Sequence, residues 1–395
     1  MSAQKAKEKF TQIYQRLPES VEFCPYRVCP IGAHVDHNFG KVTGFAIDKG
    51  ISLAYSPKQN GVIELTSLQF GKRAQWHVMM TPQKKQDDWA DYLRGATLML
   101  ANRYPLGKGL IGVIDGDLPI GGLSSSAAVT LAFMEALCDV NGIHLTGPEK
   151  VALSVAVEND YVGVSCGKLD QSCEIYSRQN HLLYLDTLDD SYELIPFGKN
   201  GGELPFDIAI FFSGVERNLS GSKFNQRVDE ARAAAYAIKG FAGLEYGKFK
   251  ETSLRDVPPE LFEKYSDRLP ENWRKRAEHW YSEQERVERG VEAWRRGDIA
   301  AYGSLSFASG SSSIYSWETG SPELKTLYDI MTRTDGIYGG RFSGAGFKGC
   351  CMALIDPAKA DEIVAKVTLE YLQAFPELEG KYRACICKST DGLEA

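Results

Sequence analysis

The segment that most restricts the possible folds of this chain runs from Leu118 to Ala128 and reads LPIGGLSSSAA. It follows an apolar run, Leu110 to Ile114, which predicts a strand, and it precedes Ser126 to Asn141, where apolar residues recur at helical spacing. Glycines let backbone N–H groups turn toward a ligand, and the helix start adds a partial positive charge. The pattern predicts an anion site with serine hydroxyls for phosphate oxygens or a metal, although a flexible loop without a ligand is the alternative for these residues alone.

A second glycine-rich segment, Arg341 to Gly349, contains a GxGxxG pattern at Gly344, Gly346 and Gly349. A dinucleotide-binding fingerprint opens a helix, whereas these glycines lead into an apolar run, Cys350 to Asp356, that predicts a strand. The dinucleotide interpretation therefore fails, and a glycine loop that approaches a bound ligand remains. The chain also lacks the GxxxxGK[ST] pattern of a Walker loop.

Polar side chains gather between Cys24 and Asn38, a segment whose Pro and Gly residues predict a loop. Besides Arg27 it carries the trio His34, Asp36 and His37. The trio could ligate a metal, or its side chains could only hold the loop together by hydrogen bonds.

Two carboxylates, Glu158 and Asp170, flank a turn that contains Gly163, Cys166 and Gly167. Such a pair suits one metal ligand and one general base, although carboxylates at helix ends are common.

The length of 395 residues favours two domains, and strands and helices occur in both halves without strict alternation, which favours an α+β fold. Residues 197–205 hold three glycines and a proline, so we predict domains at 1–205 and 206–395. The charged stretch 273–296 predicts a solvated helical face. Further strands are predicted at 44–47, 51–55, 62–65, 181–186, 206–213, 351–356 and about 384–387, and further helices at 148–162, 358–375 and from Pro322 after an N-cap at Ser321.

The composition excludes several classes of function. A net charge of −7 argues against a nucleic-acid partner, and no run of about 18 apolar residues predicts a membrane span. The start of the chain is rich in Lys and lacks the apolar core of a secretory signal. Nine cysteines without a CxxC pair indicate buried free thiols in a reducing cytoplasm. The expected partners are small molecules. The sequence does not fix the oligomeric state, and it is compatible with a monomer.

Taken in this order, these segments resemble the GHMP kinase superfamily and its galactokinase branch. The segment around Arg27 is similar to the sugar signature PGRVNLIGEHTDYNGG, and Leu118–Ala128 is similar to the phosphate loop PxxxGLSSSA. The segment that ends at Gln171 resembles CGxMDQ, residues 339–350 resemble the third family motif, and Trp89, Tyr92 and Gly95 fit a WxxYxxG element. The resemblance implies an N-terminal α+β domain and a ferredoxin-like C-terminal domain with the active site between them.

The resemblance also implies an ATP-dependent sugar 1-kinase with Mg²⁺. Asp170 would be the base that takes the proton from the anomeric hydroxyl, and Arg27 would stabilise its charge. Ser126 and Glu158 would hold Mg²⁺, while His34 and Asp36 would bind sugar hydroxyls in place of a metal. The residues assigned to ATP are Trp89, Pro119, Gly121, Gly122, Leu123, Ser124, Ser125, Ser126, Gly344 and Gly346, and those assigned to the sugar are Ala33, His34, Asp36, Gly167, Phe224 and Lys348.

Three of these positions depart from the galactokinase pattern. Ala33 replaces a Glu that contacts the C6 hydroxyl of the sugar, Lys348 interrupts a GFGG motif, and Phe224 replaces a tyrosine that reaches the sugar. A Glu about 4 Å from a C6 carboxylate would cost roughly 4 kcal/mol, about a thousandfold in affinity, so Ala33 would admit a uronic acid. The sequences of residues 25–37 and of Lys275–His279 also resemble those of the galacturonokinases of this family. The predicted substrate is D-galacturonate, the alternatives being galactose or, less favoured by the intact Arg27 and Asp170, a non-catalytic sugar sensor.

Overall fold

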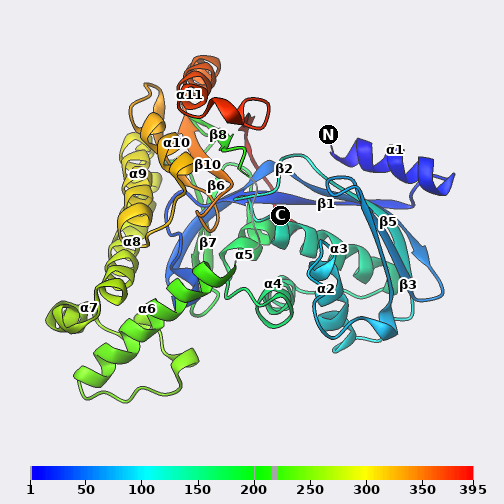
Figure 1. Ribbon diagram of the computed structural model, residues 1–395, viewed down its shortest axis with the longest axis horizontal. Helices are drawn as coiled ribbons and strands as arrows, with labels where there is room; N and C mark the ends of the chain where they lie inside the picture. Colours follow the sequence, from blue (N-terminus) through cyan, green and yellow to red (C-terminus); the bar gives the residue numbers. More distant parts are fainter. Residues whose placement is uncertain (1, 200, 216–220, 395) are drawn as a thin grey trace.

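The computed structural model describes residues 2–199, 201–215 and 221–394, which form two sheets with helices packed around them (Figure 1). The first sheet runs in the order β4-β3-β5-β2-β6-β7, with β1 and β12 also paired to β2. Its strands are β1 (Ser20–Val28), β2 (Lys41–Lys58), β3 (Val62–Ser67), β4 (Lys72–His77), β5 (Gly109–Gly116), β6 (His181–Asp186), β7 (Tyr192–Pro196) and β12 (Ser389–Thr390).

Strand β2 is the centre of the first sheet. It pairs with β6 through residues 41–44 and with β5 through residues 51–58, so the two strands predicted at 44–47 and 51–55 are one continuous strand. The short strand β12 pairs with Ala46 and Ile47, which also pair with β1, so β12 lies on the side of β2 opposite β1. The end of the chain therefore rejoins the first sheet after contributing the strands of the second.

The second sheet contains β8 (Asp207–Phe212), β9 (Ile337–Phe342), β10 (Cys350–Ile355) and β11 (Arg383–Cys387). All its pairs are antiparallel, in the order β11-β8-β10-β9. Helices separate β8 from β9, and α11 (Ala360–Ala374) separates β10 from β11. This is the βαββαβ arrangement of a ferredoxin-like fold, which confirms the architecture expected for the C-terminal domain.

Helices cover both faces of the first sheet. Helix α1 (Ser2–Tyr14) packs on β2 and β5 from one side, and α2 (Asp91–Ala101) and α3 (Ser125–Asn141) lie on the other (Figure 1). The N-terminal half also contains α4 (Gly147–Ala156), a π-helix (Val157–Val162) and α5 (Leu169–Tyr176). The C-terminal half adds α6 (Gly221–Phe241), α7 (Pro259–Tyr265), α8 (Glu271–Arg296), α9 (Ile299–Tyr315) and α10 (Pro322–Thr332).

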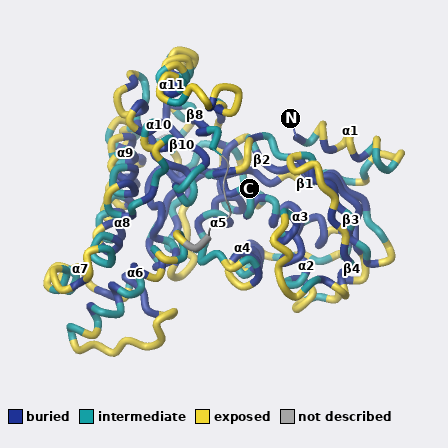
Figure 2. The backbone as a smooth tube through the Cα atoms, in the orientation of Figure 1, coloured by how far each residue is buried: buried dark blue, intermediate teal, exposed yellow. Residues whose placement is uncertain are grey.

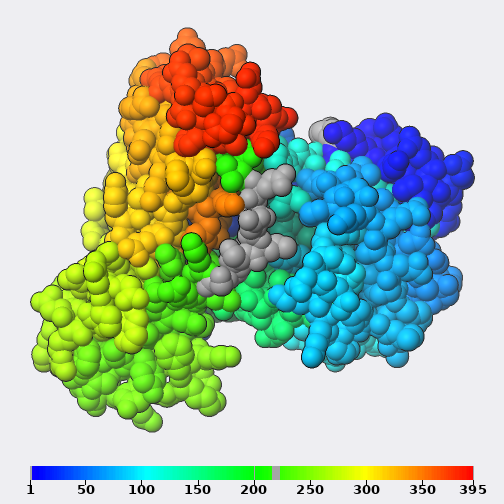
Figure 3. Space-filling model, in the orientation of Figure 1, coloured from blue at the N-terminus to red at the C-terminus, as the bar shows by residue number. Residues whose placement is uncertain are grey.

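The largest buried apolar cluster joins the two sheets. It contains Leu53 and Ile114 from the first sheet and Ile210 and Met352 from the second. Neighbouring side chains of β8 and β10 point the other way, as the two-residue period of a strand requires, and pack under α10 and α11. Figure 2 shows buried backbone running through both sheets, and Figure 3 shows the early and late parts of the chain on opposite sides of the molecule.

The structure corrects three expectations from the sequence. The segment predicted as one loop from Cys24 begins inside β1 and becomes irregular only after Val28. The helix predicted at 148–162 changes from α to π geometry at Val157. The stretch 273–296 lies in α8 as predicted, but several of its charged residues are buried, so the helix is not simply a solvated face.

Other expectations agree with the structure. The Ser321 side chain caps α10 by accepting a hydrogen bond from the Leu324 N–H. All nine cysteines fall within the described residues as free thiols, and seven of them are buried. Among the described helices, none combines the length and apolar character that crossing a bilayer requires. The domain boundary at 205/206 stays a prediction. Strand β12 follows this boundary in the sequence but pairs with β2 of the first sheet.

Candidate active site

Asp170 and Arg27 form the centre of the candidate site. Arg27 is brought from β1, and Asp170 lies in the first turn of α5. The Arg27 Nε donates to Oδ1 of Asp170 at 2.7 Å, and Nη1 donates to the carbonyl of Gly122 at 3.1 Å. Burial acts to lower the pKa of Arg27, but the Asp170 carboxylate outweighs it and holds that pKa above its usual value. The pair is therefore an ionised arginine beside a carboxylate that stays 26% exposed.

The hydroxyl of Ser124 donates a short hydrogen bond to Oδ2 of Asp170. Ser124 precedes α3 with a left-handed φ of 59°, so the loop backbone turns sharply where the helix begins. Both oxygens of Asp170 are thus oriented by donors, one from β1 and one from the glycine–serine loop. A carboxylate fixed in this way suits general-base catalysis, because its reach and direction are set before a substrate arrives.

The two glycine-rich loops pack backbone against backbone. A Cβ atom at Gly349 would lie 2.8 Å from the carbonyl carbon of Gly121, and one at Gly344 would lie 3.0 Å from the Cα of Gly122. All four glycines have positive φ values. The carbonyl of Gly346 accepts from Gly320 N–H at 2.8 Å. The second loop therefore needs glycine in order to fit the first, whether or not it touches a ligand.

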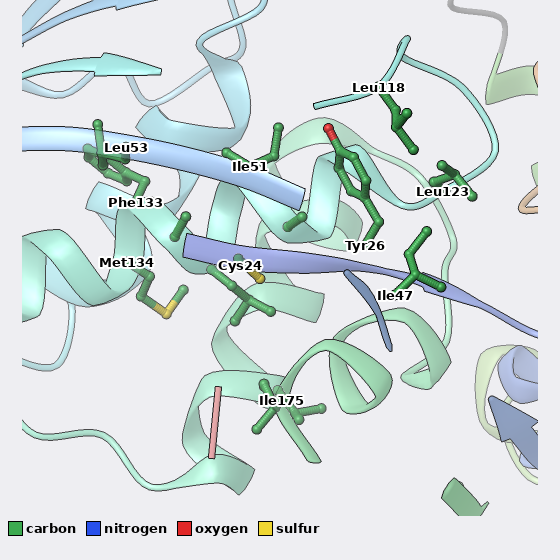
Figure 4. Packing of buried hydrophobic residues seen from close by; sticks show 14 of the residues in the cluster. Cys24, Tyr26, Ile47, Ile51, Leu53, Leu118, Leu123, Phe133, Met134 and Ile175 are labelled. Carbon is green, nitrogen blue, oxygen red and sulfur yellow. The ribbon is translucent and has the colours of Figure 1, made fainter. Parts of the chain in front are cut away.

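The remaining residues assigned to ATP, apart from Trp89, lie at the start of α3 or in the loop before it. Ser125 and Ser126 occupy its first turn, where N–H groups and the helix dipole favour an anion. The side chain of Leu123 is buried in the core beside Tyr26 (Figure 4), so only its backbone is available to a ligand. Pro119 is exposed at the start of the loop, and Trp89 stacks on Phe70 with ring centroids 6.2 Å apart.

Glu158 is buried in the π-helix between α4 and the turn before α5. Helix α2 packs closely on this segment, because a Cβ atom at Gly95 would lie 2.8 Å from the Val157 side chain. π-Helical turns are rare and often occur at functional sites. One carboxylate here and one hydroxyl in α3 are hard oxygen ligands of the type that Mg²⁺ prefers.

The predicted sugar segment is built around an aromatic cluster. The rings of His34 and His37 stack on Trp317 with centroids 5.4 and 5.2 Å apart, and Phe224 lies 6.4 and 6.0 Å from the same two histidines. Burial lowers the pKa of His34 well below its usual value and that of His37 to about 3, so both rings are neutral. Their Nε2 atoms are buried without a hydrogen-bond partner among the described residues, which leaves them for a polar ligand.

The metal alternative for this trio finds no support, since no group of three or more His, Cys, Asp or Glu side chains in the described ranges could hold a metal. Instead Asp36 faces the start of α5, and its Oδ2 accepts from the Leu169 N–H at 3.3 Å. A Cβ atom at Gly167 would lie 2.3 Å from that oxygen, so the close approach requires glycine. Burial and then the charge of Asp170 raise the pKa of Asp36 to about 6.

The loop that carries Ala33 is fixed to α8 by buried polar contacts. His279 Nε2 lies 3.0 Å from the Ala33 carbonyl, and Glu283 Oε1 accepts from the Gly32 N–H at 2.6 Å. Sequence reasoning gave Glu283 and Trp317 no role, and it noted His279 only within a segment that resembles galacturonokinases. The two polar α8 residues lie in a strongly charged stretch, and only their spacing of four on one helical face could have shown that they point inward.

Lys348 lies half-buried in the second glycine loop, and no described carboxylate forms an ion pair with it. The neighbouring Phe347 ring lies under the Arg227 guanidinium at 5.6 Å. The structure thus brings Arg27, Ser124 and Asp170 into contact and places His34 beside Phe224. Trp89 instead stacks on Phe70, and Lys348 forms no hydrogen bond or ion pair with the described members of this group.

Comparisons with known proteins agree with this arrangement. The chain is 36% identical to the galacturonokinase of Arabidopsis thaliana over 94% of its own length and 92% of that protein. Family models described as GHMP kinases N terminal domain, GHMP kinases C terminal and galactokinase galactose-binding signature match residues 91–178, 291–373 and 8–57.

The chain belongs to the galactokinase branch of the GHMP kinases. A galactokinase from Roseiflexus sp. (strain RS-1) is 30% identical over 98% of the chain and 95% of that protein. A crystal structure of Lactococcus lactis galactokinase complexed with galactose matches with a TM-score of 0.87 and 28% identity, covering 98% of this chain and 97% of that one. The resemblance and the two-domain GHMP kinase fold expected from the sequence are confirmed. As a GHMP sugar kinase, the protein is an ATP-dependent sugar phosphotransferase.

Proposed function

We propose that this GHMP kinase phosphorylates the anomeric hydroxyl of D-galacturonate and releases galacturonate 1-phosphate and ADP. In this reaction the bond between the γ-phosphorus and its bridging oxygen breaks, a bond from the sugar O1 to phosphorus forms, and the O1 proton moves to Asp170. Arg27 and Ser124 hold the carboxylate in the direction it needs. Phosphoryl transfer depends mainly on such positioning and on charge stabilisation.

The nucleotide half of the proposal assigns the β- and γ-phosphates to the backbone of Gly121–Ser125 and the first turn of α3. Ser126 and Glu158 would hold Mg²⁺, which would neutralise negative charge on the phosphates. Gly344 and Gly346 belong to the nucleotide side through the loop that packs on Gly121 and Gly122.

The observation that carries the uronate assignment is Ala33. It is 7% exposed, precedes His34, and sits in a loop that His279 and Glu283 hold in place. A methyl group there leaves space and no charge at the position where galactokinases carry a Glu. The 36% identity to a galacturonokinase supports the same substrate, and the ammonium of Lys348, which has no ion pair among the described residues, is a candidate partner for the C6 carboxylate.

Galactose is the second candidate. The galactokinases among the relatives and the galactose bound to the Lactococcus lactis enzyme favour it. The first experiment is therefore a sugar panel of galacturonate, galactose, glucuronate and arabinose, assayed by ADP release in the presence of Mg²⁺. A preference for galactose in the wild-type protein would refute the uronate assignment.

Ala33→Glu should reverse the preference. The new carboxylate can accept a hydrogen bond from the galactose C6 hydroxyl but repels a uronate, and the Coulomb cost of roughly 4 kcal/mol corresponds to about a thousandfold in the ratio of kcat/KM values. Ala33→Gln is the matched control, since it adds nearly the same volume without charge. Equal losses of galacturonate turnover in both variants would mean that bulk, not charge, excludes the substrate.

Lys348→Met tests the second charge separately. If the ammonium contacts the uronate, kcat/KM for galacturonate falls while the value for galactose is unchanged. A uniform change for both sugars would place Lys348 outside substrate discrimination and leave Ala33 as the proposed determinant.

A further inference from the structure

Two cysteines on the last strand of the second sheet lie in contact. Cys385 and Cys387 are two residues apart on β11, so their side chains share one face, and their sulfur atoms are 3.8 Å apart. Both thiols face the buried cluster that joins the two sheets, whereas Ala384 and Ile386 face the opposite cluster. Cys387 is buried and Cys385 is partly exposed. The pair therefore lies where the two halves of the molecule meet, with one sulfur open to small molecules.

The surroundings make Cys385 differ from the other cysteines. A hydrogen bond from Cys387 lowers the pKa of Cys385 against the effect of burial, and the Lys49 ammonium lowers it further, while Asp48 and Asp117 oppose this. The pKa values of the other eight cysteines are all raised. Because the thiolate is the reactive form, Cys385 has the most nucleophilic environment of the nine.

Backbone contacts connect this pair to the phosphate loop. Lys388, next to Cys387, donates from its N–H to Asp48 Oδ1 at 3.0 Å and accepts from the Asp48 N–H at 2.9 Å. Two residues later Gly50 donates to Asp117 Oδ2 at 3.1 Å and accepts from the Asp117 N–H at 3.0 Å. Asp117 directly precedes Leu118, where the glycine–serine loop begins.

We propose that Cys385 and Cys387 form a peroxide-sensitive dithiol whose oxidation to a disulfide slows phosphoryl transfer. The Cys385 thiolate attacks one oxygen of hydrogen peroxide, an S–O bond forms, the O–O bond breaks, and hydroxide leaves. The Cys387 thiol then attacks the Cys385 sulfenic acid, an S–S bond forms, the S–O bond breaks, and the thiol proton leaves with the hydroxide as water. With the two thiol protons, each disulfide consumes one peroxide and yields two waters.

The spacing on the strand makes the oxidation reversible. Alternate residues on a strand have Cα atoms roughly 6.6 Å apart, at the upper end of the range that disulfides usually span. A disulfide there pulls on β11 and is more easily reduced than a relaxed one. The same pull acts on Lys388 and, through Asp48 and Gly50, on the segment before Leu118.

The test exposes the purified full chain to graded hydrogen peroxide and follows intact mass, peptide maps and kinase kinetics. We expect a loss of two hydrogen atoms, mapped to a link between Cys385 and Cys387. The accompanying fall in kcat/KM for ATP should be about tenfold, less than the roughly hundredfold cost of a 1 Å misplacement of reacting groups. Dithiothreitol should restore both mass and activity.

Variants separate this site from other thiols. Cys385→Ser should keep the activity of the reduced protein and resist peroxide, while Cys387→Ala should accumulate a sulfenic acid at Cys385 that dimedone traps. Cys166 is also partly exposed and lies near the active site, so the reversible loss must persist in Cys166→Ala. The proposal fails if no Cys385–Cys387 link forms. It also fails if the link forms without a change in kinetics, or if the loss persists in Cys385→Ser and disappears in Cys166→Ala.

Discussion

At the scale of single residues, the candidate base is defined by its two donors. Arg27 Nε and the Ser124 hydroxyl each donate a hydrogen bond to one oxygen of Asp170, and the two donors lie about a hundred residues apart in the sequence. The sequence could predict Arg27 and Asp170 because each sits in a recognisable motif. It could not predict that Ser124 points at the base, because that depends on the left-handed turn before α3.

Asp170→Asn should reduce kcat by about 10²–10⁴-fold, because the amide still accepts from Arg27 but cannot take a proton. ATP binding, measured by calorimetry, should change little. Glu174→Gln, one helical turn further along α5, is the matched control and should retain turnover. Turnover of Asp170→Asn within threefold of wild type would remove Asp170 from the mechanism.

Glu174 itself gives a pH prediction. Its carboxyl is fully buried, and neither oxygen has a partner among the described residues. Burial, and then the charge of Asp170, raise its pKa well above the usual value, despite the opposing effect of Arg27. The folded state therefore keeps a proton that the unfolded chain releases above about pH 4.5, so this group destabilises the fold as pH rises, by about 1.4 kcal/mol per unit until the folded pKa is reached.

Glu174→Gln removes that dependence. The free energy of unfolding of the variant, relative to wild type, should increase between pH 5 and pH 8, as measured by urea denaturation at each pH. A constant difference across this range would show that Glu174 does not hold a proton in the folded protein.

At the scale of elements, the two glycine loops behave as one unit. Gly349→Ala would place a methyl group 2.8 Å from the Gly121 backbone, so the phosphate loop must move. We expect KM for ATP to rise at least tenfold, since ~1 Å shifts of positioning groups can cost about a hundredfold.

Gly380→Ala is the control for this prediction. Gly380 also has a positive φ, 79°, but nothing lies within 4 Å of an added Cβ atom, so the backbone strain is present without the clash. Equal effects of the two substitutions on KM would mean that loop packing does not position ATP.

The start of α3 and the π-helix together predict the magnesium dependence. Ser126→Ala and Glu158→Gln should each raise the Mg²⁺ concentration needed for half-maximal rate, because each removes one hard oxygen ligand. Asp160→Asn, exposed in the same π-helix, should leave the dependence unchanged. If neither active-site variant alters the Mg²⁺ dependence, the ion is held elsewhere.

Elements with a strong local pattern were predictable. The helix at 126–141 and the strand at 110–114 differ from α3 and β5 by one or two residues at their ends, because apolar periodicity fixes both. The π-geometry from Val157 was not predictable, since apolar periodicity does not separate a rare π-turn from the α-helix that precedes it. Strand β1 was read as part of a loop because Pro25 interrupts its alternation, and the register with β2 shifts at that residue.

At the scale of the whole molecule, the family resemblance implied two domains with the site between them, and the antiparallel order of the second sheet confirms the ferredoxin-like half. The partners of the buried Glu283 in α8 could not be predicted, because they lie in the loop before β2 and in α9. Strand β12 has only two residues and carries no local signal at all.

The return of the chain to β2 has a consequence for synthesis on the ribosome. Strand β2 ends at Lys58, yet β12 begins at Ser389, and residues 392–394 donate backbone hydrogen bonds to the carbonyls at the end of α5. At about 5–20 residues per second, roughly 20 to 60 s separate the emergence of these parts. For that interval the nascent protein carries a stretch of β2 that is paired with β1 on one side and lacks β12 on the other, and the carbonyls at the end of the helix that bears Asp170 gain their partners only after residue 394 has been made.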